Sequence, residues 1–353
     1  LPMGEAHAGQ TAALAGLSAR PGERIGDGFG LEAPETVPLM SVQVEPTAPL
    51  TQSALLAHLR EMEEEDPLLS VRPEADGVSV GVMGAVQVEV LQGILAARFG
   101  DVVRMCPPHV LYKETIAAPV VGIGHYEPLR HYAEVWLKLE PGAPGSGISF
   151  AADCPPNSLE ENWQRLIRTH VFERAHPGVL TGSPLCDVRI RLIAGRAHLK
   201  HTEGGDFREA TCRAIRNALM QAENVLLEPV VRFELAMPNE ALARVTGELL
   251  RIGAQLDASE TDGGETTLTG RCTAAMFWDY PTRFAASTHG HGRIASRFDR
   301  YEPCKNQDDI VRQSGYDPLA DTLNPPGSVF CSHGAGFYVA WDHVREWAHC
   351  EVE

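Results

Sequence analysis

The sequence predicts a multidomain α+β protein in which two small domains of one fold flank a middle α+β domain. The chain has 353 residues, more than one ordinary core supports, so two to four domains are expected. The predicted element order β-α-β-β-α-β occurs once before and once after the middle region, and this order is typical of ferredoxin-like domains. Hydrophobic residues make up 44% of the chain and charged residues 22%, as in ordinary globular proteins.

Five segments follow from the punctuation of the chain by Gly and Pro and from changes in hydrophobic period. They are 1–36, the remnant of a β-barrel; 37–115 and 226–303, the two ferredoxin-like domains; 116–225, the middle domain; and 304–353, a tail with a terminal helix. The first segment is too short to bury a core of its own. Because the chain also begins with Leu1 rather than Met, we expect it to be part of a longer protein.

The first ferredoxin-like domain begins with the alternating run LMSVQVEP, residues 39–46, which is typical of a half-buried strand. Two amphipathic helices and three further short strands follow, with Asp76-Gly77 as the turn between two of the strands. The predicted elements are a helix at Thr51–Met62, strands at Leu69–Arg72 and Val78–Met83, a helix at Ala85–Phe99 and a strand at Asp101–Met105.

The same order returns after residue 226, with the turn Asp262-Gly263-Gly264 between its two middle strands. The predicted elements are strands at Leu227–Leu235, Ala254–Ala258, Thr266–Cys272 and Gly292–Tyr301, and helices at Asn239–Gly253 and Thr273–Ala285. Between the two domains, the strictly alternating VRIRLIA indicates a strand. The middle domain is predicted to contain strands at Glu134–Leu139 and Cys186–Ala194 and helices at Glu160–Arg174 and Phe207–Gln221.

The tail is punctuated by Gly and Pro and is predicted to end in a helix near Trp341–Cys350. It is expected to clasp another domain rather than to fold alone. The eight cysteines are spread evenly without a CxxC pair, which favours reduced thiols and a cytoplasmic location. No apolar run approaches the ~20 residues of a membrane span, and no signal peptide opens the chain, so no membrane partner is expected.

Charge is unevenly distributed along the chain, whose formal net charge is −17. Residues 1–115 hold 7 Lys or Arg against 16 Asp or Glu, and residues 228–353 hold 11 against 19. Residues 116–227 hold 12 of each, together with 6 of the 14 histidines. Because acidic flanks repel a polyanion, DNA is not an expected partner, and any RNA contact is expected in the middle domain.

Catalytic motifs are absent from the sequence. It contains no GxxxxGK[ST], GxGxxG, HExxH or GxSxG pattern, so neither a nucleotide site nor a hydrolase nucleophile is predicted. We therefore expect no enzymatic activity, no catalytic residue and no cofactor in this chain.

Metal binding has limited support in the sequence. The pair Cys331-Ser-His333 could begin a zinc site, with Cys304, Cys350 and His289-Gly-His291 elsewhere in the chain, but the second short-spaced pair that structural zinc sites usually have is missing. No metal is therefore predicted, with Cys331 and His333 kept as the alternative.

The stretch GRAHLKHTEGGDFRE, residues 195–209, connects a predicted strand to a predicted helix. Gly204-Gly205 precede the helix, whose free N–H groups and dipole favour a nearby anion, with Asp206 as the predicted N-cap. An ordinary polar β–α connection is the alternative. Two more loops, EPLRH at 127–131 and VLTGSP at 179–184, are predicted to matter only if they converge with this one. Arg130 between Tyr126 and Tyr132 suits stacking on unpaired bases.

Four sets of motifs resemble successive domains of elongation factor G. PLMSVQVEPTAP and GVMGAVQVEVLQGILAARFG are similar to its third domain, and GVLTGSPLCDVRIRLIAGRAH and GGDFREATCRAIRNALMQA to its fourth. VLLEPVVRFELAMPNEALARVTGELLRIGAQL and STHGHGRIASRFDRYEP resemble the fifth, and EAHAGQTAALAGL the end of the second, barrel domain. The resemblance covers about residues 1–303 in the family's order.

The resemblance implies a ribosome-binding translational GTPase. It implies that a G domain, which would bind GTP and Mg²⁺, precedes Leu1, so the longer protein is expected to be a GTPase. It further implies that the middle domain has the fold of ribosomal protein S5 domain 2 and reaches the decoding region. The last ferredoxin-like domain would lie near the stalk base and the sarcin–ricin loop, so the partners are the ribosome, with rRNA of both subunits, and the G domain. The chain is expected to be a monomer.

The family carries a histidine at the tip of its fourth domain, and this role is carried over to His198 and its neighbours Leu199, Lys200, His201 and Thr202. The other two loops add further expected rRNA contacts at the tips of the middle domain, namely Tyr126, Arg130, His131, Thr181 and Ser183. Those expected in a loop of the last domain are Thr288, His289, Gly290, His291 and Arg293.

The branch of the family is suggested by one loop and by the tail. The loop HYEPLRHYA lacks the glycine pair of the translocase's SGGRGQYG type, and with the tail it is nearest to the tetracycline resistance ribosomal-protection proteins. The tip HLKHTEGG lacks the proline that those proteins carry. Tetracycline release, a translocase-like or stress role, and a zinc-binding protein built on the tail therefore stay open.

Overall fold

The computed structural model describes residues 5, 7, 9, 10, 16 and 38–351, except 75 and 76. It contains two compact units, residues 1–109 and 110–353, each of which is described by itself. The predicted β-barrel remnant at 1–36 lies almost wholly outside the described residues, as does Asp76 of the predicted turn. The α+β multidomain class is confirmed. Within the described part of the chain, no helix has the length and apolar character needed to cross a membrane.

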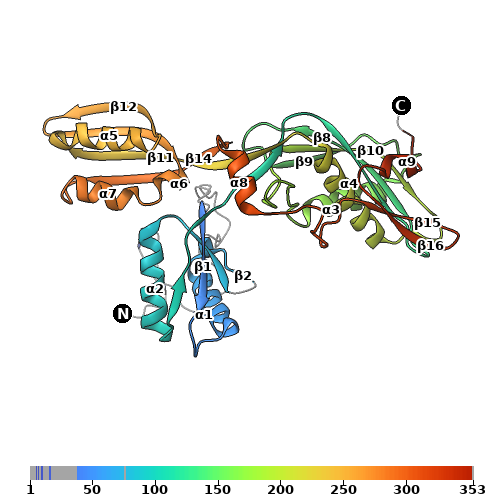
Figure 1. Ribbon diagram of the computed structural model, residues 1–353, viewed down its shortest axis with the longest axis horizontal. Helices are drawn as coiled ribbons and strands as arrows, with labels where there is room; N and C mark the ends of the chain where they lie inside the picture. The colour runs from blue at the N-terminus through green and yellow to red at the C-terminus, as the bar shows by residue number, and fades with distance from the viewer. Residues whose placement is uncertain are drawn as a thin grey trace. The chain divides into compact units, whose positions relative to one another are not determined.

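The first unit is a ferredoxin-like domain, as predicted. Its sheet has the order β2-β3-β1-β4, with β1 antiparallel to β3. Helices α1 and α2 pack against the sheet (Figure 1) and bury the Leu55, Leu59, Leu91 and Leu95 side chains. The elements are β1 (Met40–Pro46), α1 (Gln52–Glu65), η1 (Pro67–Leu69), β2 (Arg72–Pro73), β3 (Val78–Val82), α2 (Ala85–Phe99) and β4 (Val103–Met105), followed by the short β5 (His109–Val110).

The middle domain is built on a six-stranded sheet of order β16-β15-β7-β8-β10-β9. Both predicted strands and both predicted helices are present, and several further strands join them. The elements are β7 (Val120–Tyr126), β8 (Ala133–Pro141), β9 (Ile148–Ala152), α3 (Glu161–Phe172), β10 (Val188–Ala197) and α4 (Gly204–Gln221). The preceding strand β6 (Lys113–Ile116) pairs instead with residues 224–227, in the sheet of the last domain. Helix α3 and helix α4 cover one face of the sheet (Figure 1), where Phe207 and Ile167 are buried against the strands.

Helix α4 lies unusually close to β7 because two glycines of that strand face it. A Cβ atom on Gly122 would lie 2.0 Å from the carbonyl oxygen of Ala214, and one on Gly124 would lie 1.8 Å from that of Ala210. Both distances are far below van der Waals contact, so any side chain at either position would push α4 off the sheet. The pattern VVGIGHY therefore fixes where α4, and the loop before it, can lie.

The tail completes the middle domain, which agrees with the expected clasp. Its elements are α8 (Gln307–Ser314), β15 (Ser328–Ser332), β16 (Ala335–Val339) and α9 (Val344–Trp347). Strand β15 pairs in parallel with β7, where Val329 meets Tyr126. Phe330 and Val344 cover the second face of the sheet against Trp136. The predicted terminal helix is only the four residues of α9, shorter than the expected range near Trp341–Cys350.

The last domain is again ferredoxin-like, with the sheet order β12-β13-β11-β14. The elements are β11 (Asn224–Pro238), η2 (Asn239–Ala241), α5 (Leu242–Arg251), β12 (Gln255–Asp262), β13 (Glu265–Thr273), α6 (Ala274–Phe277), α7 (Tyr280–Ser287) and β14 (Arg293–Pro303). The single helix predicted at Thr273–Ala285 is wrong. Pro281 lies in the first turn of α7, where its missing N–H is tolerated, so it starts a second helix instead of continuing the first.

Candidate functional site

The loop between β10 and α4 is an exposed polar turn, as the sequence predicted. His198, Leu199, Lys200 and His201 are all exposed. Thr202 closes the turn, because its Oγ1 accepts a 2.7 Å hydrogen bond from His198 N–H and donates one of 2.6 Å to the carbonyl of Tyr132. The N–H groups of His201 and Thr202 also donate to the carbonyl of His198. The loop is therefore an ordered tip that is attached to Tyr132, the residue just before β8.

The exposed side chains of this tip form a small recognition surface. The rings of His198 and His201 stack, with centroids 4.5 Å apart and planes inclined by 21°. Leu199 is fully exposed, and the Lys200 ammonium stands beside it in the chain. Stacked rings next to a cation can pack on an unpaired base and pair with a phosphate, which is how single-stranded RNA is commonly bound.

The start of α4 is already occupied by carboxylates. Its N-cap is Glu203, and Asp206 is the N3 residue of a capping box, in which Glu203 N–H donates to Asp206 Oδ2 over 2.8 Å. The prediction of Asp206 as N-cap is wrong. The predicted anion cradle at Gly204-Gly205 is not supported either, because side chains of the chain itself use the helix terminus.

The loop at 127–131 converges with the tip, as the second predicted loop should. His131 Nδ1 lies 2.8 Å from Asp206 Oδ1, and the N–H of Tyr132 donates to the other carboxylate oxygen over 3.4 Å. Arg130 is exposed, and its φ is positive at 67°. Tyr126 is only half-exposed and lies beneath the Arg213 guanidinium, 5.7 Å from its ring centroid. Arg130 and His131 therefore belong to the tip more than Tyr126 does.

The third loop does not converge with the other two, and grouping Thr181 and Ser183 with the tip is wrong. Their N–H groups and the Thr181 hydroxyl all donate to the buried carboxylate of Glu114. Glu114 bridges to Leu185, just before β10 begins, whereas the tip follows its last residue. Ten residues of strand separate the two ends by roughly 30 Å. The hydrogen bonds to Glu114 therefore hold this loop in its conformation.

The predicted loop of the last domain is only partly available for contacts. Thr288 is buried, and its Oγ1 donates 2.9 Å to the carbonyl of Phe284, so its hydroxyl serves the fold. His289, Gly290 and His291 are exposed, and the first two have positive φ. Arg293 is exposed and forms a 2.5 Å ion pair with Glu265.

Of the tail pair, Cys331 lies in β15 and His333 in the turn between β15 and β16. Among the described residues, the only group of three ligand-type side chains close enough to share an ion is a different one: His125, Glu134 and His349. The alternative of a zinc site on Cys331 and His333 therefore gains no third ligand within the described part of the chain.

Glu134 is an anchor for the tail rather than a metal ligand. Its carboxylate accepts hydrogen bonds from His125 Nδ1 and Trp136 Nε1, each over 2.8 Å, and from the backbone N–H groups of His349 and Cys350. Burial alone would raise the pKa of Glu134, but these hydrogen bonds lower it to about 2. Its lone pairs are taken by protein donors, which leaves little for an ion.

Comparisons with known proteins show which families two parts of this chain resemble. Residues 108–223 match the family described as Elongation factor G, domain IV, and residues 225–310 match Elongation factor G C-terminus. The crystal structure of ttk003000868 from Thermus thermophilus is similar in fold, with a TM-score of 0.66 and 24% sequence identity. The similarity covers 79% of this chain but 43% of that one, so the chain spans less than half the length of the protein it resembles. Residues 108–223 of this chain are therefore similar to domain IV of elongation factor G, and residues 225–310 to its C-terminal domain.

Proposed function

We propose that this chain is the ribosome-binding C-terminal region of a translational GTPase and acts by placing the tip of its middle domain on ribosomal RNA. In this proposal, a separate G domain binds GTP and Mg²⁺, and the chain works as a monomer without chemistry of its own. The observation that carries the proposal is the ordered tip, on a domain that matches elongation factor G domain IV. The exposed loop of the last domain, with His289 and His291, supplies a second rRNA contact.

The physical properties of the tip suit contact with RNA. Asp206 joins the two loops, so little conformational entropy is lost when they bind. Lys200 and Arg130 provide two exposed cations within the one region whose charge is balanced. Each phosphate that a Lys or Arg neutralises makes the affinity for RNA more salt-dependent. A contact through two such groups predicts a shallow dependence on salt, unlike that of a protein coated with nucleic acid.

Ribosome pelleting with the protein at its full cellular length tests the proposal. The variant combines His198→Ala, Lys200→Ala and His201→Ala, and we expect its affinity for ribosomes to fall by about tenfold or more, since stacking alone contributes about 1–3 kcal/mol per base. Arg189→Ala is the control, because Arg189 is exposed on the same strand but at its other end and its loss changes the charge by the same amount. Equal pelleting of the triple variant, the control and the parent would remove the tip from the function.

Release of tetracycline is the narrower form of this function that we propose from the sequence. It rests on the loop HYEPLRHYA, which lacks the glycine pair of translocases. Bacteria that produce the full-length protein should grow at tetracycline concentrations that stop cells producing the triple tip variant. If both strains have the same drug sensitivity while the parent still binds ribosomes, the chain serves a translocase-like or stress function instead.

A further inference from the structure

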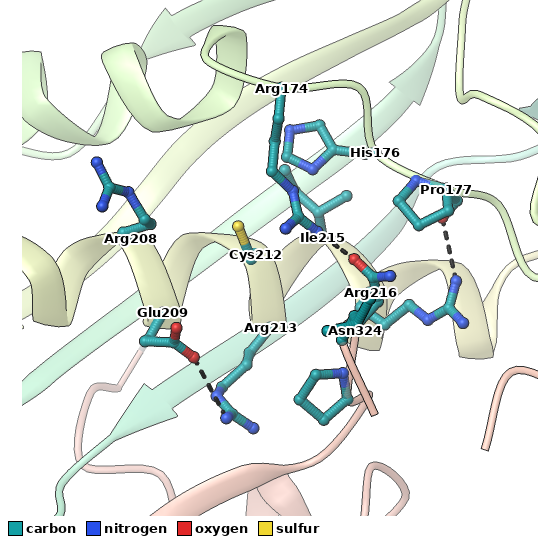
Figure 2. A pocket seen from close by; sticks show the side chains of 12 residues that line it. Arg174, His176, Pro177, Arg208, Glu209, Cys212, Arg213, Ile215, Arg216 and Asn324 are labelled. Atoms are coloured by element: carbon teal, nitrogen blue, oxygen red, sulfur yellow. Dashed lines mark hydrogen bonds and ion pairs between the residues drawn. The ribbon is translucent and has the colours of Figure 1, made fainter. Parts of the chain in front are cut away.

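A pocket lined by four arginines lies between α4, the segment after α3 and the tail, away from the residues assigned to the tip. Arg208, Arg213 and Arg216 come from α4, and Arg174 comes from the segment that follows α3. Figure 2 shows Arg174 reaching Asn324 of the tail beside the Cys212 side chain. The cavity volume is about 60 Å³, room for roughly four to six water-sized groups. This matches the phosphorus and four oxygens of a phosphate.

The arginines differ in how far their charge is already balanced. Arg208 pairs with Glu173 at 2.7 Å, and Arg213 with Glu209 at 3.4 Å. Arg174 has no carboxylate within 4.0 Å among the residues that the structure describes, and its hydrogen bond goes to the side-chain carbonyl of Asn324. One guanidinium charge at this pocket is therefore not neutralised by an acidic side chain.

The two buried arginines retain N–H groups that no protein atom accepts. Arg213 is 9% exposed and Arg216 is 3% exposed, and both line the pocket. Arg213 donates to the carbonyl of Gly327, and Arg216 to those of Pro177 and Gly178, yet the Nε atom of each is buried without a partner among the described residues. Leaving a buried charged donor unsatisfied costs about 1–3 kcal/mol or more, so these two side chains are held in place at a cost to stability, and the anion contacts fall to the more exposed Arg174 and Arg208.

His176 contributes no positive charge to the pocket at neutral pH. Burial lowers its pKa, Arg174 nearby lowers it further, and its Nε2 donates to the carbonyl of Val171. Guanidinium groups bind phosphate oxygens through paired N–H donors, and Arg exceeds Lys in this role because its planar fork matches the oxygens. The carboxylate of Glu209 on the wall sets a limit on how much negative charge the pocket accepts.

We propose that this pocket binds a small phosphate-bearing anion, either free phosphate or the terminal phosphate of a nucleotide. Arg174 supplies the uncompensated charge, and Arg208 exchanges part of its pairing with Glu173 for the anion, while Arg213 and Arg216 line the inner wall. Because Leu323, Asn324 and Pro325 of the tail form one wall, the bound anion would also fasten the tail to α4.

Calorimetric titration of the full chain with inorganic phosphate, against chloride at matched ionic strength, tests the proposal. We expect one site per chain and an affinity that falls by about tenfold or more in the double variant Arg174→Gln with Arg208→Gln, since two charge-assisted contacts are lost. Both residues are exposed, so the variant should fold. Arg165→Gln on α3, exposed and outside the pocket, should bind within about twofold of the parent. If a nucleoside diphosphate competes with phosphate for the pocket, the natural ligand is a nucleotide phosphate. If it does not compete, the ligand is the free anion.

A second measurement does not depend on any variant. Cys212 is half-buried in the pocket, and Cys331 is half-buried on β15 outside it. Phosphate should slow alkylation of Cys212 and leave that of Cys331 unchanged, as followed by peptide mass spectrometry. The proposal would be overturned if the heat of binding and the protection of Cys212 from alkylation were no greater with phosphate than with chloride. Equal phosphate affinity of the double variant and the parent would overturn it as well.

Discussion

The Nδ1 atom of His131 lies 2.8 Å from Oδ1 of Asp206, and this contact joins the β7–β8 loop to the first turn of α4. The same carboxylate accepts hydrogen bonds from the N–H groups of Glu203 and Tyr132. One buried side chain thus holds both loops of the tip. The shape of the tip therefore depends on a residue that does not itself face a partner.

Asp206→Asn should loosen the tip. An amide has one acceptor oxygen in place of two, so either a backbone N–H loses its acceptor or the His131 ring must change its tautomer to accept from the amide, at a cost of about 1–3 kcal/mol. We expect a corresponding drop in the free energy of unfolding and faster amide hydrogen exchange at residues 198–206, with other helices unchanged. An Asn variant with unaltered exchange in both loops would show that the turn made by Thr202 suffices alone.

Gly124→Ala should be among the most damaging single substitutions in the middle domain. The added Cβ would lie 1.8 Å from the carbonyl oxygen of Ala210 and 2.5 Å from the amide nitrogen of Ala214. Backbone atoms cannot move aside singly, so we expect a loss of about 3 kcal/mol or more, beyond ordinary overpacking. Gly205→Ala, on the helix α4 that Gly124 faces, is the matched control, because its Cβ would meet nothing within 4 Å. Urea unfolding compares the two, and similar midpoints would refute the close approach of α4.

The pH dependence of tail docking follows from Glu134. Its pKa is lowered to about 2 in the folded chain from the ordinary value of 4.5. A lowered pKa stabilises the fold above the unfolded value, and this contribution is lost as the pH falls from about 5 to about 2. Its size is at most about 3 kcal/mol.

Tryptophan fluorescence during urea unfolding measures this effect, because Trp136, Trp163, Trp341 and Trp347 all lie in the middle domain and tail. The parent should lose more stability between pH 5 and pH 2 than Glu134→Gln, which is already destabilised at neutral pH. Parallel losses in the two proteins would mean that Glu134 does not control acid unfolding.

Local pattern predicted the elements whose period is strong. The strand VRIRLIA, the helix predicted at Asn239–Gly253 and both βαββαβ orders are present in the structure. Strands β15 and β16 were not predicted, because β15 adds to an edge formed by β7, about two hundred residues earlier, and hydrophobic period carries no such long-range information. The break at Pro281 was missed because apolar residues continue across it.

The candidate site shows the same division. The tip residues follow from their loop and their resemblance to a family, whereas the role of Asp206 depends on His131, which comes from a different loop. Thr181 and Ser183 look like a polar loop in the sequence, and only the buried Glu114 reveals that their donors are used. The arginine pocket left one sequence signal: Arg208, Cys212 and Arg216 recur every fourth residue, along one face of α4.

Glu114→Gln should separate stability from ribosome binding. Glu114 is 1% exposed, and its carboxylate accepts hydrogen bonds from Leu180 N–H over 2.9 Å and from the N–H groups of Thr181 and Ser183. Replacing one acceptor oxygen by an N–H group should cost about 2–4 kcal/mol of unfolding free energy, since several donors to a charged group are affected. Glu161→Gln is the control, because Glu161 is an exposed partner of Arg165 at 3.6 Å, and it should cost less than about 1 kcal/mol.

Because the loop lies at the far end of β10 from the tip, ribosome pelleting of the folded Glu114→Gln protein should match that of the parent. A tenfold loss of pelleting, with the circular dichroism spectrum intact, would instead place Thr181 and Ser183 in contact with the ribosome, as the sequence first indicated.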